Sequence, residues 1–256
     1  MGRRPQIDFE EVRALMSGGL GDSEIARLTS VPRSTISGWR HGRGSHYHER
    51  LATARSSWRP NDGAAYCYLL GVYLGDGCLN VAPRGAATTL IVSLDGEYSA
   101  VVAEVERAIA RTFAGVNSRR QTVPGSRVAI VCVCHPALPF AFPQHGPGRK
   151  HLRPIELAPW QRGLTRDHPG SLLRGLIHSD GCRTINRFRT ALPSGRIAEY
   201  EYPRYFFSNL SADIRRIFCE HCELLGIRWS QSNPRNISVS HRDSVKRMDA
   251  FVGPKR

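Results

Sequence analysis

The sequence predicts an α+β fold in which two copies of one αββαββα unit follow a small all-α domain. Two observations predict it. The order of helical and strand-like patterns in residues 62–142 recurs in residues 170–256, and each copy opens on a similar pattern, LLGVYLGDG at 69–77 and LRGLIHSDG at 173–181. An internal repeat of this kind decides a fold more firmly than any single element. Two copies in one chain predict a pseudo-dimer with an interface along the repeat axis.

The composition is that of a globular chain with an excess of positive charge. The 256 residues are 41% hydrophobic, and 36 Lys and Arg against 22 Asp and Glu give a net charge of +14. These values argue against an acidic, membrane-embedded or disordered protein. A positive field attracts polyanions, so nucleic acid is the expected partner. Non-specific RNA binding and membrane-surface binding are the alternatives.

No apolar run of about eighteen residues is present, which predicts a cytoplasmic protein with no membrane partner. The seven cysteines, an odd number, are expected to be reduced thiols. Cys132 and Cys134 lie on one face of a strand pattern. Cys219 and Cys222 form a lone CxxC inside a helical pattern, so a zinc site is an open alternative.

Residues 1–45 are predicted to form a helical DNA-binding domain. Helices are expected at about 9–16, at 23–28 with Asp22 as N-cap, and from a first turn containing Pro32 to just before Gly42. Small and apolar side chains are expected to pack these helices together: Ala26, Val31, Ile36 and Trp39.

The segment EIARLTSVPRSTISGWRHG resembles the bacterial helix-turn-helix motif, with Ser30 at the turn where that family usually has Gly. The resemblance implies that the third helix presents hydroxyl and guanidinium groups to a DNA major groove. These groups belong to Arg33, Ser34, Thr35, Ser37 and Arg40. A three-helix packing module with a solvated polar face is the alternative.

Residues 46–61 are expected to be a linker with a short helix at Tyr47–Arg55. In the first repeat, 62–142, helices are expected at 64–75, 97–114 and 137–142, strands at 78–82 and 88–94 with Pro83-Arg84-Gly85 in the turn, and a hairpin at 116–134. Residues 143–169, rich in Pro and Gly, are expected to be a second linker. In the second repeat, 170–256, helices are expected at 171–179, 211–225 and 243–251, and strands at 182–191, 199–208, 227–230 and 236–241.

The pattern that opens each repeat has a physical meaning of its own. Small residues four apart, Gly71 with Gly75 and Gly175 with Ser179, share one helical face and allow two helices to approach backbone to backbone. Asp76 and Asp180 then end those helices, each before a glycine that tolerates a left-handed conformation. Two carboxylates brought together at the repeat axis repel each other unless cations are present, and such hard oxygen ligands favour Mg²⁺. Metal-assisted phosphodiester hydrolysis follows as a hypothesis.

These paired motifs resemble the LAGLIDADG homing endonuclease family in its single-chain, two-motif form, over about residues 62–252. The resemblance implies that the motif helices form the interface between halves, with Gly71, Gly75, Gly175 and Ser179 as contacts. It also implies that Asp76 and Asp180 bind Mg²⁺, and that saddle-shaped four-stranded sheets lie in the DNA major groove. The first acid of the family motif is replaced by Leu74 and by His178. We expect His178 to tune the site, to pack or to be solvated.

Strand residues support DNA contact. Alternation in CRTINRFRTA places Arg183, Arg187 and Arg189 on one face with Ile185, where guanidinium groups reach phosphates and guanines. The first half offers the more neutral Asn80, Arg84, Thr88 and Ser93. An ordinary solvated hairpin face is the alternative in each half. The aromatic residues Tyr200, Tyr202, Tyr205, Phe206 and Phe207 are expected to pack rather than to stack on bases.

Both parts of the chain therefore predict sequence-specific binding of double-stranded DNA. One hypothesis is a Mg²⁺-dependent endonuclease with Asp76 and Asp180 as catalytic metal ligands. The other is a transcriptional regulator, resembling bacterial regulators that join a LAGLIDADG-like domain to a helix-turn-helix, or a DNA-binding remnant that does not cut. Two-motif chains act as monomers in the family, so we expect a monomer on DNA in the bacterial nucleoid.

Overall fold

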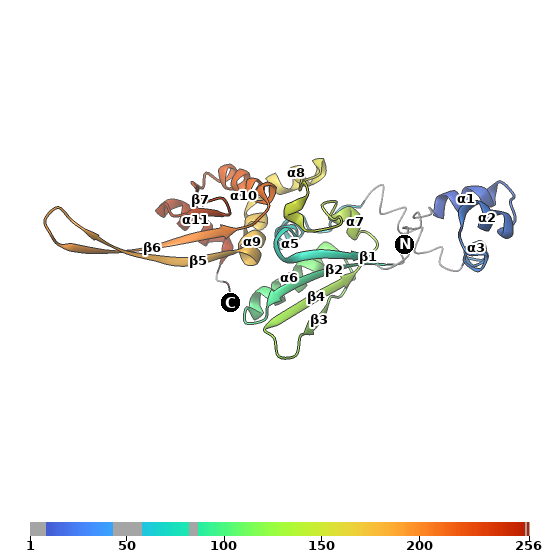
Figure 1. The fold of residues 1–256 in the computed structure, drawn as a ribbon, viewed down its shortest axis with the longest axis horizontal. Helices are drawn as coiled ribbons and strands as arrows, with labels where there is room; N and C mark the ends of the chain where they lie inside the picture. The colour runs from blue at the N-terminus through green and yellow to red at the C-terminus, as the bar shows by residue number, and fades with distance from the viewer. Residues whose placement is uncertain (1–8, 43–57, 82–86, 254, 256) are drawn as a thin grey trace. The chain divides into compact units, whose positions relative to one another are not determined.

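The computed structural model describes residues 9–42, 58–81, 87–253 and 255 (Figure 1). The expected helix at Tyr47–Arg55 and the expected DNA contact Arg84 lie outside these residues. The chain divides into two compact units, of which the first comprises residues 1–59 with 81–88 and 135–141. The second comprises 60–80, 89–134 and 142–256. Among the described helices, none is both long and apolar enough to cross a membrane.

The N-terminal residues form three short helices around a small core. The helices are α1 (Phe9–Ser17), α2 (Asp22–Thr29) and α3 (Arg33–Arg40). Val12, Ile25, Val31 and Ile36 are buried at their centre. Ala26 and Trp39 pack against this core, as the sequence predicted.

The helix starts differ from the prediction by one residue. Asp22 is the first residue of α2 rather than its N-cap, and Pro32 is the N-cap of α3 rather than part of its first turn. In the first turn of α2 the Asp22 carboxylate is favoured by the helix dipole. There it accepts a hydrogen bond of 2.7 Å from Arg40 Nε, while Arg40 Nη2 donates to Leu20 O at 2.8 Å. Arg40 therefore ties the end of α3 to the start of α2.

Ser30 follows α2 with φ +58°, in the left-handed region. It is the single non-glycine residue with positive φ among those described. The turn therefore has the backbone that a glycine would favour, and serine occupies it against a steric penalty.

The first repeat has the predicted element order. It runs α5 (Gly63–Asp76), β1 (Gly77–Val81), β2 (Thr88–Asp95), α6 (Ser99–Thr112), β3 (Arg119–Thr122), β4 (Val128–Cys134) and α7 (Leu138–Ala141). The strands form a four-stranded sheet in the order β1-β2-β4-β3. Side chains of β2 and β4 alternate, with Leu90, Val92 and Val131 buried on the inner face.

The second repeat has the same topology. It runs α9 (Pro169–Asp180), β5 (Gly181–Ala191), β6 (Ile197–Ser208), α10 (Ala212–Leu224), β7 (Ser230–Asn233), β8 (Asn236–Val239) and α11 (Arg242–Val252). Its sheet order, β5-β6-β8-β7, matches that of the first. The rings of Phe207 on β6 and Phe218 on α10 stack at 4.5 Å in its core. Two αββαββα units and three N-terminal helices confirm the predicted fold class.

The segment between the repeats is more ordered than predicted. Residues 143–169 contain a short 3₁₀ helix (Lys150–Leu152) and α8 (Pro159–Asp167), two elements that were not predicted from the sequence. Pro159 lies in the first turn of α8, where proline is favoured. Gln161 Oε1 accepts from the Ala158 backbone N–H at 2.8 Å, which closes that turn.

α5 and α9 make the most extensive helix–helix contact of the structure, through small residues. A Cβ on Gly71 would lie 2.8 Å from Leu176 N, and a Cβ on Gly175 would lie 3.0 Å from Val72 N. The added atoms would also clash with Leu172 O and Tyr68 O, which lie closer still, so glycine is required for this separation of the helices. About one helical turn further along, a Cβ on Gly75 would lie 2.5 Å from the Cβ of Ser179.

We predict that Gly175→Ala destabilises the protein by about 3 kcal/mol, because the new methyl group must push two backbones apart. Gly163→Ala is the matched control, since Gly163 lies inside α8 with open space around it. This control should stabilise by about 0.5–1 kcal/mol through helix propensity. Urea unfolding measures both changes. Equal effects of the two substitutions would contradict the close helix contact.

We predict that Ser30→Gly stabilises the N-terminal helices by about 1 kcal/mol, because the left-handed penalty disappears. Gly19→Ser is the reverse control, because Gly19 has φ +82° and no atom within 4 Å of an added Cβ. It should destabilise by a similar amount through backbone strain alone. Hydrogen exchange of amides in α2 and α3 reports both. Faster exchange in Ser30→Gly would show that the serine side chain stabilises the turn.

Candidate functional site

The packed helices α5 and α9 end side by side, each on an aspartate. Asp76 is the last residue of α5 and Asp180 the last of α9. A Cβ on Gly75 would lie 2.9 Å from Asp180 Oδ2. The Asp180 carboxylate therefore lies directly beside Gly75, the residue before Asp76. The close helix contact therefore determines how near the two acids approach.

Gly77 and Gly181, which follow the acids, do not have the left-handed conformation that the sequence suggested. Their φ angles are −94° and −124°, which are extended. Glycine is required at these two positions because a larger residue would clash with the preceding helix. A Cβ on Gly77 would lie 2.6 Å from Tyr73 Cα, and one on Gly181 would lie 2.8 Å from Ile177 Cα. Each glycine lets a strand leave directly beside the helix that it follows.

Burial and like charge disfavour ionisation of the two acids. Burial is the larger cause and the neighbouring Asp180 the second, and together they raise the pKa of Asp76 to about 6. Burial also raises the pKa of Asp180 above its usual value. Asn209 Nδ2 donates to Asp180 Oδ2 at 2.6 Å and partly opposes that rise.

Lys150 lies at the end of α5, and the sequence analysis did not assign it. Its Nζ donates to Leu74 O at 3.0 Å, to Gly75 O at 3.1 Å and to Tyr73 O. All three ammonium protons are thus engaged by backbone carbonyls at the negative end of the helix dipole. Burial lowers the pKa of Lys150 to about 8, while Asp180 and Asp76 oppose that change.

Lys255 has the equivalent place at the end of α9. Its Nζ donates to Ser179 O at 3.4 Å and to Gly181 O at 3.2 Å, and it lies 5.2 Å from the centre of the Tyr98 ring. Burial lowers its pKa, against the opposing field of Asp76. Lysine is rare here, with three residues among 36 basic ones, and two of the three lie at this site. That rarity is the signal that could have identified them.

The chain end that carries Lys255 is anchored by polar side chains of α9. His178 Nε2 lies 3.1 Å from Val252 O, and Arg174 Nη1 donates to Phe251 O at 2.6 Å. The same Arg174 forms hydrogen bonds of 2.6 and 2.7 Å with both carboxylate oxygens of Glu104 on α6. Burial lowers the pKa of His178 to about 4. His178 is therefore neutral and packed, and positions the segment that precedes Lys255.

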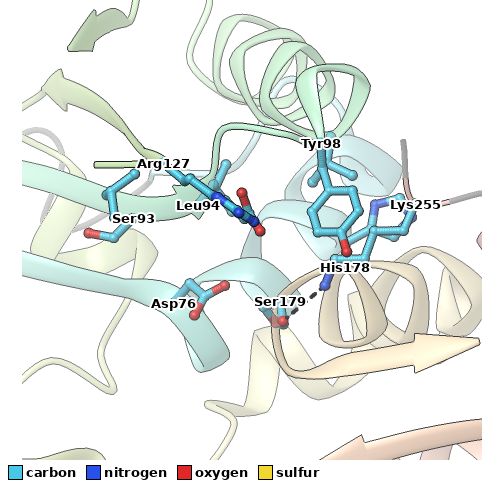
Figure 2. Close-up of a pocket in the computed structure, with 11 residues that line it drawn as sticks. Asp76, Ser93, Leu94, Tyr98, Arg127, His178, Ser179 and Lys255 are labelled. Carbon is cyan, nitrogen blue, oxygen red and sulfur yellow. Dashed lines mark hydrogen bonds between the residues drawn. The ribbon is translucent and has the colours of Figure 1, made fainter. Parts of the chain in front are cut away.

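A cavity of about 430 Å³ opens beside the two acids (Figure 2). Its lining includes Asp76, Ser179 and Lys255 together with Ser93, Tyr98 and Arg127. Figure 2 shows the Lys255 ammonium reaching towards the end of α9, where its hydrogen bond to Ser179 O is drawn. An acid, a cation and backbone carbonyl groups thus share one solvent-accessible hollow.

The donor set fits a hard divalent cation. Two carboxylates are held together although each raises the cost of ionising the other, and a bound cation would remove that cost. Within the described part of the chain, no three His, Cys, Asp or Glu side chains are grouped so that they could hold a metal. Any site at Asp76 and Asp180 would therefore have just these two protein carboxylates, which suits Mg²⁺ because it retains several waters.

The residues predicted to read DNA from α3 divide into two groups. Arg33 and Ser34 are exposed, and Thr35 and Ser37 are half-buried. Arg40 is exposed but held by Asp22 in an ion pair of 2.7 Å. The first four side chains are available to a partner, whereas Arg40 would have to exchange an existing contact.

In the first sheet, Asn80 and Ser93 are exposed. Thr88 is buried, so its expected place on the exposed face is wrong. It shares the parity of Leu90 and Val92, which face inward, and successive side chains of a strand alternate between faces.

In the second sheet, Arg183, Arg187 and Arg189 do share one face, but it is the face that turns towards the helices. Arg183 Nε donates to Asp249 Oδ1 of α11 at 2.8 Å. Arg187 and Arg189 pair across the hairpin with Glu201 and Glu199 at 3.1 and 2.6 Å. All three guanidinium groups are therefore paired with carboxylates. The prediction that they share one face is confirmed, whereas their contact with DNA stays a prediction; the sequence defines two faces of the strand without showing which one packs.

No protein-family model and no curated protein matches the chain. Among solved structures, it is similar to the LAGLIDADG meganuclease I-AabMI bound to uncleaved DNA, with 11% identity, a TM-score of 0.47 and coverage of 73% of this chain and 82% of that one. It is also similar to the homing endonuclease I-WcaI bound to its DNA recognition sequence, with 11% identity, a TM-score of 0.46 and coverage of 80% of this chain and 87% of that one. Mesophilic variants of the homing endonuclease I-DmoI share 13% identity with the chain at a TM-score of 0.43, with coverage of 75% of this chain and 97% of that one. With such low identities, what this chain does has to be inferred from its own residues.

We predict that Asp76 destabilises the metal-free protein progressively as pH rises from about 4 to about 6, because its raised pKa means that the folded state holds this proton longer than the unfolded state. The lowered pKa of His178 acts in the opposite direction over this range, so the comparison with Asp76→Asn isolates the contribution of Asp76. Asp76→Asn should remove this loss and stabilise the protein at pH 7.5 by roughly 3 kcal/mol, with no gain at pH 3.5. Urea unfolding in a chelator measures this. Asp213→Asn is the control of opposite sign, since a hydrogen bond from the Ile155 N–H lowers the pKa of Asp213. A gain for both variants at pH 7.5 would contradict the assignment.

Proposed function

We propose that the chain is a Mg²⁺-dependent endonuclease that binds and cuts double-stranded DNA at a long, asymmetric target. The observation that carries this proposal is the pair Asp76 and Asp180, held together at the ends of two closely packed helices against their own repulsion. A structural role does not explain such a pair, because neighbouring half-buried carboxylates that are only partly compensated destabilise a fold. The resemblance of both helices to the LAGLIDADG motif supports the same conclusion.

In this proposal Asp76 and Asp180 hold the metal, and a bound cation would favour the ionised form of each. Bound Mg²⁺ would supply an activated water and stabilise the leaving oxygen of a phosphodiester. Asn209 orients the Asp180 carboxylate through its 2.6 Å hydrogen bond. Gly77 and Gly181 start the two strands next to the acids, so DNA lying on the sheets would pass directly over them.

The lysines supply positive charge where negative charge collects. Lys150 already satisfies its three protons with carbonyl groups, so it acts through its field and not as a proton donor. Lys255 lines the cavity, and within the described residues its ammonium group donates two hydrogen bonds to backbone carbonyl groups, those of Ser179 and Gly181. Lys255 is therefore the better placed to meet a phosphate oxygen in the cavity.

The two halves of the protein differ in the side chains they offer to DNA. The first sheet exposes Asn80 on β1, Ser93 on β2, and Arg119 and Gln121 on β3, whereas the second sheet carries the long hairpin β5–β6 with exposed aromatic and charged side chains. Unlike halves recognise unlike half-sites, so we expect an asymmetric target and a monomer acting on chromosomal DNA in the cytoplasm. Arg33, Ser34, Thr35 and Ser37 of α3 would add contacts in a further major groove.

A non-cleaving transcriptional regulator is the second candidate. The observation that favours it is the separate three-helix unit, whose α3 exposes Arg33 and Ser34 at its N-terminal end, where a recognition helix contacts bases. In this case Asp76 and Asp180 would be relics of an ancestral site.

We predict that genomic fragments captured by the protein in a chelator acquire discrete new ends within the bound site when Mg²⁺ is added. Asp76→Asn and Asp180→Asn should bind the same fragments and cut at least about 100-fold more slowly, because the lost metal ligand stabilises the transition state by several kcal/mol. Sequencing of bound fragments before and after addition of Mg²⁺ measures both steps.

Asp243→Asn, the same chemical change at an exposed residue of α11, is the control and should cut normally. Enriched fragments that remain intact with the unmodified protein would favour the regulator. No enrichment at all would reject DNA recognition in both forms.

A further inference from the structure

The hairpin β5–β6 extends beyond the sheet that it belongs to. Residues Gly181–Ala191 pair with Ile197–Phe207 along their whole length, whereas β8 pairs only with residues 205–208 of β6. In Figure 1 the orange hairpin projects well past the helices of its repeat. Its outer part is thus a two-stranded ribbon with both faces towards solvent, a shape that a DNA major groove admits.

One face of the ribbon, here the arginine face, carries Arg183, Arg187 and Arg189 with Glu199 and Glu201. At the root of the ribbon this face continues into the protein core, because Tyr205 is buried and donates from its hydroxyl to Asp249 on α11 at 2.6 Å. The helices therefore lie on this side of the sheet. Its guanidinium groups are all paired with carboxylates, which leaves little net charge for DNA.

The opposite face, here the aromatic face, carries Phe188, Tyr200 and Tyr202. Phe188 stacks on Tyr200 with ring centres 5.2 Å apart, and both Phe188 and Tyr200 lie within 6.0 Å of Tyr202. These rings are not buried by anything else in the described chain, since Phe188 is 44% and Tyr202 is 39% exposed. An exposed apolar cluster of this kind indicates a binding surface.

Nearer the root, the aromatic face becomes polar and basic. Asn186 is paired in register with Tyr202, and Thr184 with Arg204. The Arg204 guanidinium lies 4.0 Å from the Phe206 ring centre, and its buried Nε finds no acceptor within the described residues. The aromatic face thus leads from Cys182, two residues after Asp180, through an arginine and an asparagine to the three rings.

We propose that the aromatic face, and not the arginine face, lies against the base edges and that its rings read thymine methyl groups in an A·T-rich half-site. This inference rests on the proposed function. The 5-methyl of thymine is the apolar group of the major-groove edge and suits Phe188 and Tyr202, while an amide such as Asn186 recognises adenine. The net charge of +14 and the continuity of this face with the carboxylate pair favour DNA over a protein partner.

The proposal also locates the contacts. Phe188 is seven residues from Gly181, which at about 3.4 Å per residue is roughly 24 Å along the ribbon. With a rise of about 3.4 Å per base pair, the methyl-dependent positions should lie about six to eight base pairs from the centre of the cut.

The test uses the full chain in a chelator. A random double-stranded library gives the preferred target, and each thymine is then replaced singly by deoxyuridine, which removes only the methyl group. We expect binding to weaken about threefold to fivefold per contacted methyl, from the cost of about one apolar carbon, at the positions stated above. Phe188→Ala should abolish this methyl dependence while leaving the preferences of the other half-site unchanged.

Arg187→Ala is the matched control, one residue away on the arginine face, and should retain the methyl dependence. If Arg187→Ala removes it, or if deoxyuridine never weakens binding in that half-site, the proposal is wrong although DNA binding stands. If Phe188→Ala weakens every position of both half-sites equally, the rings only stiffen the ribbon and the proposal is again wrong. Failure to enrich any DNA would instead overturn the proposed function.

Discussion

The close crossing of α5 and α9 is the contact on which the rest of the molecule depends. Gly71 and Gly175 remove the side chains that would hold the helices apart, and Gly75 opposite Ser179 extends the approach to the helix ends. Each helix also opens one repeat, so this contact joins the two halves of the fold. Because Asp76 and Asp180 are the next residues, the same backbone separation sets the distance between the carboxylates.

That separation creates an electrostatic problem which the surrounding residues partly solve. Two half-buried acids at carbonyl-rich helix ends concentrate negative charge, and burial together with the neighbouring Asp180 raises the pKa of Asp76 to about 6. Lys150 and Lys255 each bond to the carbonyl groups at one of these ends, so their charges offset the acids without occupying the space between them. The compact ammonium group suits this position because its three protons can point to three neighbouring carbonyls. The fold and the site are therefore stabilised by the same contacts.

The sequence predicted the repeat, the elements and the acid pair, because these depend on local periodicity and on a motif that occurs twice. It did not predict Lys150, which lies in a Pro- and Gly-rich segment whose fold depends on α5. Alternation correctly grouped Arg183, Arg187 and Arg189, but the burial of Tyr205 decides which face is inside, and that is a tertiary effect. The burial of Thr88 could have been predicted, since its two-residue spacing from Leu90 and Val92 places it on the same, apolar face of the strand.

The two halves have diverged unequally around a shared centre. The acids and the glycines after them occur in both repeats, and a lysine lies at the end of each motif helix, as expected if both strands of one duplex meet equivalent chemistry at the axis. The sheets have no such constraint, because each contacts a different stretch of DNA in the proposed complex. Aromatic rings on β5 and β6 face solvent at a cost in solubility, whereas the equivalent face of the first sheet has Asn80 and Ser93. Selection for a particular half-site explains that asymmetry, and selection for stability alone does not.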